Sequence, residues 1–351
     1  MPQAIAYAID SPTGRFSRTT IERREPGPTE VLFDVKYAGI CHSDIHTARG
    51  EWGPTTYPLV PGHEIAGIVT QVGSQVTKFA VGDRIGVGCY VDSCGECELC
   101  TSGWENFCQS EDAPTVWTYG DTGRDGRPTA GGYSTVFTVE QDYALHIPES
   151  IPLEKAAPLL CAGITLYSPL KRFGAGPGKR VAIVGMGGLG HMGVQIAAAM
   201  GAEVAVISHG RSKEADAKRF GATEFYATSE PGTLEGLRRS FDLIVTTLSI
   251  AEDVTPLIEC LTMFGALVDV GLPEDAVEVK VGAMCTGNRT FAGSNLGGIG
   301  MIQEMLDFCA EHGLAAETEV IGGEDINEAY DRVVASDVRY RFVIDTSTFT
   351  A

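Results

Sequence analysis

The chain has 351 residues, of which 44% are hydrophobic and 21% are charged. This length exceeds what one hydrophobic core usually serves, so it predicts two domains. Lys and Arg number 26 against 46 Asp and Glu, and the net charge of −20 repels polyanions, which excludes nucleic acid as an expected partner. The sequence has neither an apolar run near the roughly 18 residues of a membrane span nor a secretory signal pattern, so we expect a cytoplasmic protein outside the membrane.

Ten cysteines are present. Cytosolic thiols stay reduced, so a disulfide framework is not expected. Metal binding is the leading explanation for this many cysteines.

The first 150 residues contain short β-type runs, such as residues 31–37 and 67–73, separated by Gly, Pro and Asp turn signals. The N-terminal residues read as a first strand. This pattern of short β-type runs separated by turn signals predicts a compact β-rich domain. Residues 120–132, rich in Gly, Asp and Pro, predict an exposed loop that leads into the next strand.

Four cysteines fall within fifteen positions of this β-rich part, with the spacing C-x-x-C-x-x-C-x7-C: Cys94, Cys97, Cys100 and Cys108. Four thiolates in a short loop can close a tetrahedral zinc site. Such a site excludes water and substrate, so its expected role is structural. An iron–sulfur cluster is the alternative for a similar cysteine run, but no other feature indicates electron transfer.

From about Pro158 helical stretches alternate with buried-strand runs, which predicts βαβ units and a parallel sheet. The strand runs are residues 180–184, 204–207, 241–247 and 266–270. The tail contains two helical stretches, residues 301–312 and 327–336, and a last strand at residues 340–345. The pattern alone does not say which domain this tail joins.

A glycine motif, Gly185-Met-Gly187-Gly188-Leu189-Gly190, follows the first of these strands and opens an apolar helix over residues 189–200. This context is typical of dinucleotide binding. Gly185 permits a tight turn, Gly187 lets the backbone approach a pyrophosphate, and Gly190 lets helix and strand pack closely. The free N–H groups of the helix N-terminus then bind the phosphates.

The end of the second strand indicates which dinucleotide is bound. NAD sites carry an acidic residue there for the ribose 2′-OH, but this sequence has Ser208, followed by Arg211 and Lys213. A small hydroxyl and two cations suit a 2′-phosphate, so we predict NADP(H).

A second set of metal-ligand types is dispersed along the chain: Cys41, the pair His63-Glu64, and Cys161. Spacing alone does not unite them, and each could be an ordinary core residue. Their surroundings are more specific. The stretches Gly39-Ile-Cys41-His-Ser43-Asp44-Ile-His46 and Gly62-His63-Glu64-x-x-Gly67-x5-Gly73 closely resemble the signature of zinc-dependent medium-chain alcohol dehydrogenases.

The resemblance covers the whole chain and is closest to the cinnamyl alcohol dehydrogenase-like branch, particularly its bacterial NADP-dependent enzymes. The segments that carry it are Trp117-Thr-Tyr, Gly131-Gly-Tyr, Leu160-Cys161-Ala-Gly-Ile-Thr165-Leu-Tyr, Ala292-Gly-Ser294-Asn and Met305-Leu-Asp-Phe-Cys. It implies an α/β chain with a GroES-like β-rich catalytic domain (residues 1–160 and 297–351) and a doubly wound Rossmann NADP-binding domain (residues 161–296). It also implies a homodimer formed by sheet-to-sheet pairing, with residues 293–300 near the subunit contact.

The resemblance further implies roles for individual residues. Cys41, His63 and Cys161 would bind a catalytic zinc with Glu64 as an intermittent ligand, Ser43 and His46 would form a proton relay, and Asp44 would orient the site. The remaining matches are cofactor positions, His42, Thr165, Gly185, Gly187, Gly188, Leu189, Gly190, Ser208, Arg211, Lys213, Ser294 and Asn295, and two substrate-pocket positions, Trp52 and Trp117.

These features predict two zinc ions per chain and reversible hydride transfer between NADP(H) and a small primary alcohol or aldehyde of aliphatic, benzylic or cinnamyl type. Two other classes remain as alternatives. An NADPH-dependent reductase of activated double bonds would share the superfamily. A non-enzymatic zinc-binding interaction protein would explain the four-cysteine loop but neither the glycine motif nor the second ligand set.

Overall fold

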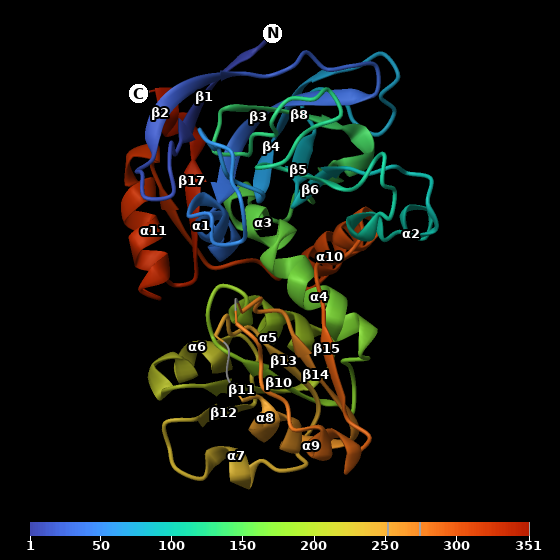
Figure 1. The fold of residues 1–351 in the computed structure, drawn as a ribbon, viewed down its shortest axis with the longest axis vertical. Helices are drawn as coiled ribbons and strands as arrows, with labels where there is room; N and C mark the ends of the chain where they lie inside the picture. Colours follow the sequence, from blue (N-terminus) through green and yellow to red (C-terminus); the bar gives the residue numbers. More distant parts are fainter. Residues whose placement is uncertain (251–252, 274, 351) are drawn as a thin grey trace. The chain divides into compact units, whose positions relative to one another are not determined.

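The computed structural model describes residues 1–250, 253–273 and 275–350. It divides the chain into two compact units: unit 1 comprises Met1–Cys161 and Gly297–Ala351, and unit 2 comprises Ala162–Leu296. Both chain termini therefore belong to unit 1 (Figure 1). No helix in the described part of the chain is long and apolar enough to cross a membrane.

Unit 1 is built on a seven-stranded sheet with the order β16-β17-β3-β4-β5-β9, in which β8 also pairs with β3. Its strands are β3 (Glu30–Gly39), β4 (Ile65–Val72), β5 (Arg84–Val87), β8 (Val136–Glu140), β9 (Leu145–His146), β16 (Thr318–Ile321) and β17 (Arg341–Asp345). The tail joins this sheet because β17 pairs antiparallel with β3. The described residues of the predicted loop 120–132 are largely exposed and precede β8.

Smaller elements complete unit 1. Two further strand pairs are β1 (Gln3–Ala8) with β2 (Ser17–Glu22) and β6 (Tyr90–Asp92) with β7 (Val116–Trp117). The helices are α1 (His42–Ala48), α2 (Glu98–Thr101), α3 (Leu153–Ala156), α10 (Ile299–Glu311) and α11 (Ile326–Val334). One core cluster joins β1, β17, α1 and α11, with Tyr7, Ile45, Tyr133 and Phe342 buried together.

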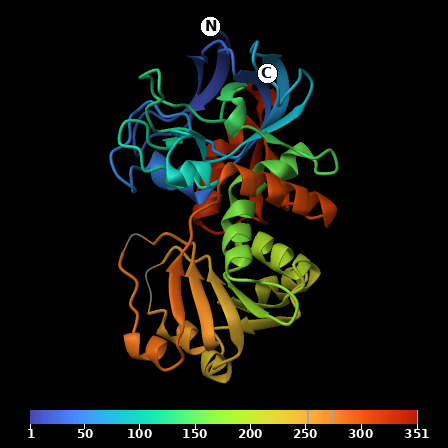
Figure 2. The ribbon, with the colours of Figure 1, turned by 90° about the vertical axis from the view of Figure 1, so that its right-hand side faces the viewer.

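Unit 2 is a six-stranded parallel sheet with the order β12-β11-β10-β13-β14-β15. The strands are β10 (Arg180–Val184), β11 (Glu203–Ser208), β12 (Glu224–Ala227), β13 (Phe241–Thr246), β14 (Leu261–Asp269) and β15 (Thr290–Gly293). Its helices are α4 (Ala162–Arg172), α5 (Gly190–Ala199), α6 (Glu214–Arg219), α7 (Thr233–Gly236), α8 (Thr255–Glu259) and α9 (Val281–Cys285). They lie on both faces of the sheet (Figure 2).

This strand order is that of a dinucleotide-binding sheet, in which the first strand lies between the second and the fourth. β10 is that first strand, and β11 and β13 flank it. Its residues Val181–Val184 are buried, which explains the continuous apolar run in the sequence. The predicted α/β fold, a β-rich unit with a doubly wound parallel sheet, is confirmed.

Candidate active site and metal centres

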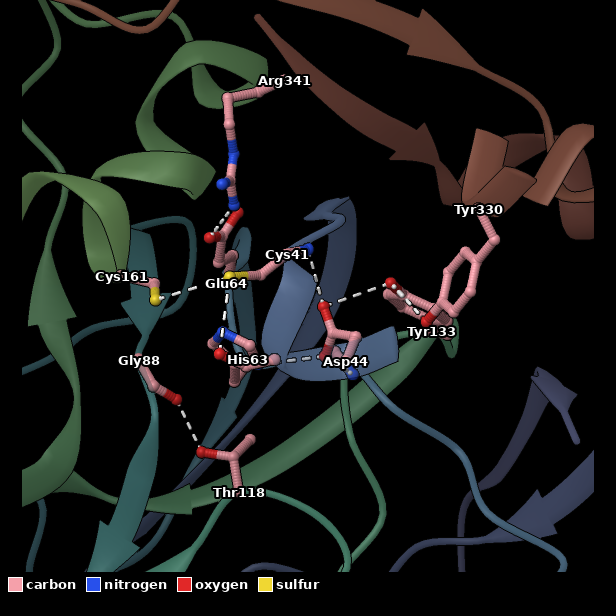
Figure 3. Close-up of polar contacts among 12 residues, drawn as sticks. Cys41, Asp44, His63, Glu64, Gly88, Thr118, Tyr133, Cys161, Tyr330 and Arg341 are labelled. Carbon is pink, nitrogen blue, oxygen red and sulfur yellow. Dashed lines mark hydrogen bonds and ion pairs between the residues drawn. The ribbon is translucent and has the colours of Figure 1, made fainter. Parts of the chain in front are cut away.

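The fold of unit 1 brings the dispersed ligand set together. Cys41, His63, Glu64 and Cys161 are all buried, and one ligand atom from each lies within 4.8 Å of the others. The Sγ atoms of Cys41 and Cys161 are 4.0 Å apart although the residues are separated by 120 positions. Cys41 precedes α1, the pair His63-Glu64 precedes β4, and Cys161 ends the first stretch of unit 1 (Figure 3).

The chemistry of this group fits a zinc ion. Two thiols and an imidazole are preferred zinc ligands, and three protein ligands leave one position for substrate, as in catalytic sites. Nε2 of His63 and Oε2 of Glu64 are buried and have no hydrogen-bond partner among the described residues. Buried polar atoms nearly always have a partner, so these two atoms fit coordination of a cation.

The carboxylate of Asp44 orients His63. Asp44 is fully buried on α1, and its Oδ1 accepts a hydrogen bond from Nδ1 of His63 at 3.0 Å and from the backbone N–H of Gly62 at 3.2 Å. Its Oδ2 accepts from the backbone N–H of Cys41 at 2.9 Å. Because Nδ1 donates its proton to Asp44, Nε2 is left with its lone pair for a metal.

Glu64 is held by Arg341, a residue that the sequence analysis missed. Arg341 begins β17, and its guanidinium donates to Oε1 of the fully buried Glu64. Burial raises the pKa of Glu64 to about 7, against the opposing effect of the Arg341 charge. One arginine at the start of an apolar strand was the available signal in the sequence. A charge in a buried strand requires a partner of opposite charge, which indicates a buried carboxylate nearby.

Gly39 makes room for this ion pair. A Cβ atom at Gly39 would lie 2.0 Å from Oε2 of Glu64, closer than any real contact. The first glycine of the Cys41 stretch is therefore explained by the close approach of Glu64.

The proton-relay candidates lie on α1. The Sγ of Cys41 is 3.7 Å from the Oγ of Ser43, and Nδ1 of His46 is 2.6 Å from the carboxylate of Glu51. The ring of Trp52 stacks on His46 with centroids 4.9 Å apart. The structure thus places Trp52 beside His46, the histidine predicted to relay protons, and adds Glu51 as a partner that was not predicted from the sequence. The signal in the sequence that could have indicated Glu51 was its position, five residues after His46.

The other candidates of unit 1, His42 and Trp117, lie on different elements. His42 is an exposed residue at the start of α1, and Trp117 lies on β7, where its backbone N–H donates to Asp121. A further thiol, Cys89, was missed. Hydrogen bonds with the thiols of Cys41 and then Cys89 raise the pKa of Cys161 well above its ordinary value, so Cys89 lies at the same centre.

The four-cysteine loop forms a second, separate group. One sulfur from each of Cys94, Cys97, Cys100 and Cys108 lies within 4.8 Å of the others. The backbone N–H groups of Glu96 and Cys97 donate to Sγ of Cys94 at 3.4 and 3.3 Å. Hydrogen bonds from the backbone at Cys100, then at Gln109, lower the pKa of Cys97 to about 6. Four converging sulfurs in a short loop fit a closed tetrahedral zinc site.

The glycine motif of unit 2 has the geometry of a dinucleotide site. Gly185 follows β10 with a φ of +90°, a conformation that side chains disfavour. A Cβ at Gly190 would lie 2.0 Å from the carbonyl oxygen of Gly185, whereas a Cβ at Gly187 would meet no atom within 4 Å. The turn is therefore tightly packed at Gly185 and Gly190 and has open space at Gly187. Through Gly188 and Leu189 it leads into the N-terminus of α5.

The remaining cofactor candidates are also placed in unit 2. Ser208 ends β11, and Arg211 and Lys213 form the following short 3-10 helix. Thr165 is buried on α4, and Ser294 and Asn295 follow β15. The guanidinium of Arg211 is already engaged by two carboxylates, Glu230 at 2.5 and 2.9 Å and Glu214 at 2.9 Å.

A parallel sheet of dinucleotide-binding topology, combined with two groups of side chains suited to zinc, is typical of zinc-containing oxidoreductases. Comparison with known proteins places the chain more narrowly. Residues 27–149 match the alcohol dehydrogenase GroES-like domain, and residues 188–311 match the zinc-binding dehydrogenase family. The chain belongs to the family of zinc-binding alcohol dehydrogenases with a GroES-like domain.

Individual relatives match this chain over almost their whole length. The chain is 54% identical to the NADP-dependent alcohol dehydrogenase C of Mycobacterium tuberculosis over 347 residues, which cover 99% of each protein. Among solved structures, it is similar to a cinnamyl alcohol dehydrogenase from Sorghum bicolor, with a TM-score of 0.94 and 41% identity over 99% of this chain and 98% of that one. A second is the cinnamyl alcohol dehydrogenase of Helicobacter pylori complexed with NADP(H), with a TM-score of 0.92, 41% identity and 98% coverage of both chains.

The open and closed cysteine groups predict different outcomes of substitution. We expect Cys161→Ser to fold with the wild-type circular dichroism spectrum, to lose about one zinc per chain and to lose nearly all turnover. Cys97→Ser removes a ligand of the closed site, so we expect it chiefly to reduce the yield of folded protein. Metal analysis, circular dichroism and turnover measure these effects.

The exposed Cys285 supplies the matched control, because Cys285→Ser changes a thiol outside both groups. It should keep two zincs and full turnover. Full turnover of a zinc-depleted Cys161→Ser protein would contradict the assignment of the open group.

Proposed function

We propose that this protein is an NADPH-linked, zinc-dependent alcohol dehydrogenase that interconverts small primary alcohols and aldehydes of aliphatic, benzylic or cinnamyl type. The observation that carries the proposal is the buried convergence of Cys41, His63 and Cys161, whose three ligand atoms leave one coordination position for substrate. The names of the relatives, NADP-dependent alcohol dehydrogenase and cinnamyl alcohol dehydrogenase, support it. Ten free cysteines, six of them in metal-ligand groups, suit the reducing cytoplasm.

In this mechanism Cys41, His63 and Cys161 hold the catalytic zinc. When bound, zinc is a Lewis acid that polarises a carbonyl oxygen and lowers the pKa of an alcohol hydroxyl. Two thiolates offset the charge of the dication and keep it a mild Lewis acid, which suits a reversible reaction. Asp44 holds the imidazole of His63 with Nε2 toward the metal.

Glu64 acts as an intermittent ligand. Its Oε1 is bound by Arg341, and its Oε2 has no hydrogen-bond partner among the described residues. The ion pair with Arg341 therefore holds Oε1 in place, whereas Oε2 would be the oxygen available to a bound zinc.

Ser43 and His46 move the proton. Ser43 Oγ, which lies 3.7 Å from the sulfur of Cys41, accepts the alcohol proton and passes it toward His46. Glu51 binds Nδ1 of His46, so Nε2 is the nitrogen that takes part in the transfer. His46 is partly exposed, so it delivers the proton to solvent. The glycine turn after β10 would hold NADP(H), which would supply the hydride chemistry when bound.

The activity assay follows directly. We expect purified protein to oxidise NADPH when an aldehyde is added, and absorbance of NADPH measures the rate for aliphatic, benzylic and cinnamyl aldehydes. With cinnamaldehyde the product should be cinnamyl alcohol, because the zinc centre acts on the carbonyl. Formation of the saturated aldehyde would support the double-bond reductase instead, and no oxidation with any aldehyde would contradict the proposal.

Charge at the end of β11 sets the cofactor preference. An acidic residue there would repel a 2′-phosphate, whereas Ser208 does not, and Lys213 supplies a cationic donor. Arg211 contributes less in this proposal, because Glu214 and Glu230 already neutralise it.

We therefore expect wild-type protein to prefer NADPH strongly. Ser208→Asp should lower kcat/KM for NADPH far more than for NADH, and Lys213→Ala should lower only the NADPH value. Arg238→Ala, which removes a cation paired with Glu259 elsewhere in unit 2, is the matched control and should leave the ratio unchanged. A wild-type preference for NADH, or an unchanged ratio in both variants, would contradict the assignment.

The edge strand β15 supports a homodimer in this proposal. β15 is one of the two edge strands of its sheet, and no other strand in the described part of the chain pairs with its outer edge, which a second copy can extend. We expect light scattering to give twice the mass of one chain at micromolar concentration. Thr290→Lys places like charges on both copies of this exposed edge and should weaken the dimer, whereas Thr19→Lys on the exposed strand β2 should not. A monomeric wild-type protein would contradict the dimer.

A further inference from the structure

The carboxylate of Asp44 is the most heavily hydrogen-bonded group at the metal centre. Besides Gly62, His63 and Cys41, it accepts a fourth hydrogen bond: the hydroxyl of Tyr133 donates to Oδ2 at 3.3 Å. Asp44 has no exposed surface. A buried carboxylate stays ionised and fixed only when donors replace its water, so each of these four bonds helps determine where the carboxylate lies.

Tyr133 is in turn oriented by Tyr330. The hydroxyl of Tyr330, on α11, donates to the hydroxyl of Tyr133 at 3.2 Å. Tyr133 has no exposed surface and Tyr330 is 7% exposed. Figure 3 shows the two rings leading from α11 to Asp44. Because Tyr133 accepts from Tyr330, its own proton points toward Asp44. A hydrogen-bonded chain therefore links α11 to the Asp44 carboxylate, which also accepts from His63.

Both phenols remain protonated donors. Burial, then the nearby Asp44 charge, raises the pKa of Tyr133 well above its ordinary value, and the same two causes raise the pKa of Tyr330. A third tyrosine, Tyr119, covers His63 from the side, with ring centroids 5.8 Å apart and nearly parallel planes. The imidazole is therefore fixed by a hydrogen bond at Nδ1 and by a ring against its face.

The surrounding packing fixes the tyrosine positions. Arg23 donates to the carbonyl oxygens of Ala130 and Gly131, immediately before Tyr133. Gly62 leaves space for the Tyr133 ring, because a Cβ there would lie 2.6 Å from its Cδ1. Tyr330 packs edge-on against Phe16 with centroids 4.8 Å apart.

We propose that Tyr133 and Tyr330 are positioning residues for the catalytic metal, which act through Asp44 on the ligand His63. The inference rests on the proposed function in that the metal at His63 is the catalytic zinc. Phenylalanine would fill the same volumes without a polar group to bury, so the two hydroxyls are explained by the carboxylate that they serve. A helix of the C-terminal tail, α11, thereby helps to orient a ligand contributed by residue 63.

The test uses hydroxyl deletions in the zinc-loaded protein. Tyr133→Phe leaves Oδ2 of Asp44 with one fewer donor, so we expect the zinc held by His63 to leave about tenfold faster when a chelator is added. Tyr330→Phe should cause a smaller change in the same direction, because Tyr133 can still donate. The cysteine-bound zinc of the four-cysteine loop leaves in a separate phase that neither variant should alter.

Tyr7→Phe is the matched control. Tyr7 is buried in the same core cluster and also donates to a carboxylate, Glu324 at 2.8 Å, but it has no link to Asp44. All three variants should fold with similar thermal stability. In cobalt-substituted protein, we expect the visible absorption bands of the metal to shift in Tyr133→Phe and to match the wild type in Tyr7→Phe.

Zinc release and cobalt spectra do not depend on a substrate, so they separate this inference from the proposed function. Wild-type rates and spectra in Tyr133→Phe, or equal acceleration in Tyr133→Phe and Tyr7→Phe, would overturn the positioning role. Failure of the wild-type protein to reduce any aldehyde would overturn the proposed activity alone.

Discussion

Two carboxylates without exposed surface, Asp44 and Glu64, impose the main constraint on unit 1. Removing an ionised carboxylate from water is costly unless hydrogen bonds or an opposite charge replace the solvent. The two carboxylates are stabilised in different ways. Donors from Cys41, the turn before β4 and Tyr133 surround Asp44, whereas the guanidinium of Arg341 faces Glu64.

This constraint accounts for the return of the tail to unit 1. β17 pairs with β3 through Val343 opposite Gly39, which places Arg341 near the residues that follow β3 and precede β4. The absence of a side chain at Gly39 then admits Glu64. Arg341, 300 positions downstream of Cys41, is thus required for the charge balance of the centre.

The features that could be predicted from the sequence are those that depend on a local pattern of residues. Buried strands of unit 2, the glycine turn and the four-cysteine loop each arise from residues close together in the chain, and their signals are of fixed period or spacing. β10 has the predicted bounds, and α5 differs by one residue at each end. β16 has no such signal, since its four residues are only partly buried or exposed.

What could not be predicted depends on contacts between distant residues. The Cys41 group was expected only from its resemblance to a family, because no spacing rule relates positions 41, 63 and 161. Tyr330 and Arg341 join the centre from the tail, and neither has a neighbour in sequence that indicates a polar role. Arg211 shows the same limit. The local pattern indicates a cation for phosphate, but Glu230, 19 positions later, binds its guanidinium.

The two cysteine groups would differ in the net charge of the zinc site and in whether a substrate can reach the metal. Four thiolates around a zinc dication give a net charge of about −2, which the backbone N–H groups of Glu96 and Cys97 partly offset. Such a metal attracts no further anion and has no open position. Two thiolates and a neutral imidazole give a charge near zero, so the metal keeps its affinity for a substrate oxygen. Glu64 would add a negative charge to this centre, and Arg341 compensates it. The ion pair therefore keeps the Lewis acidity of the open centre close to what its three ligands set.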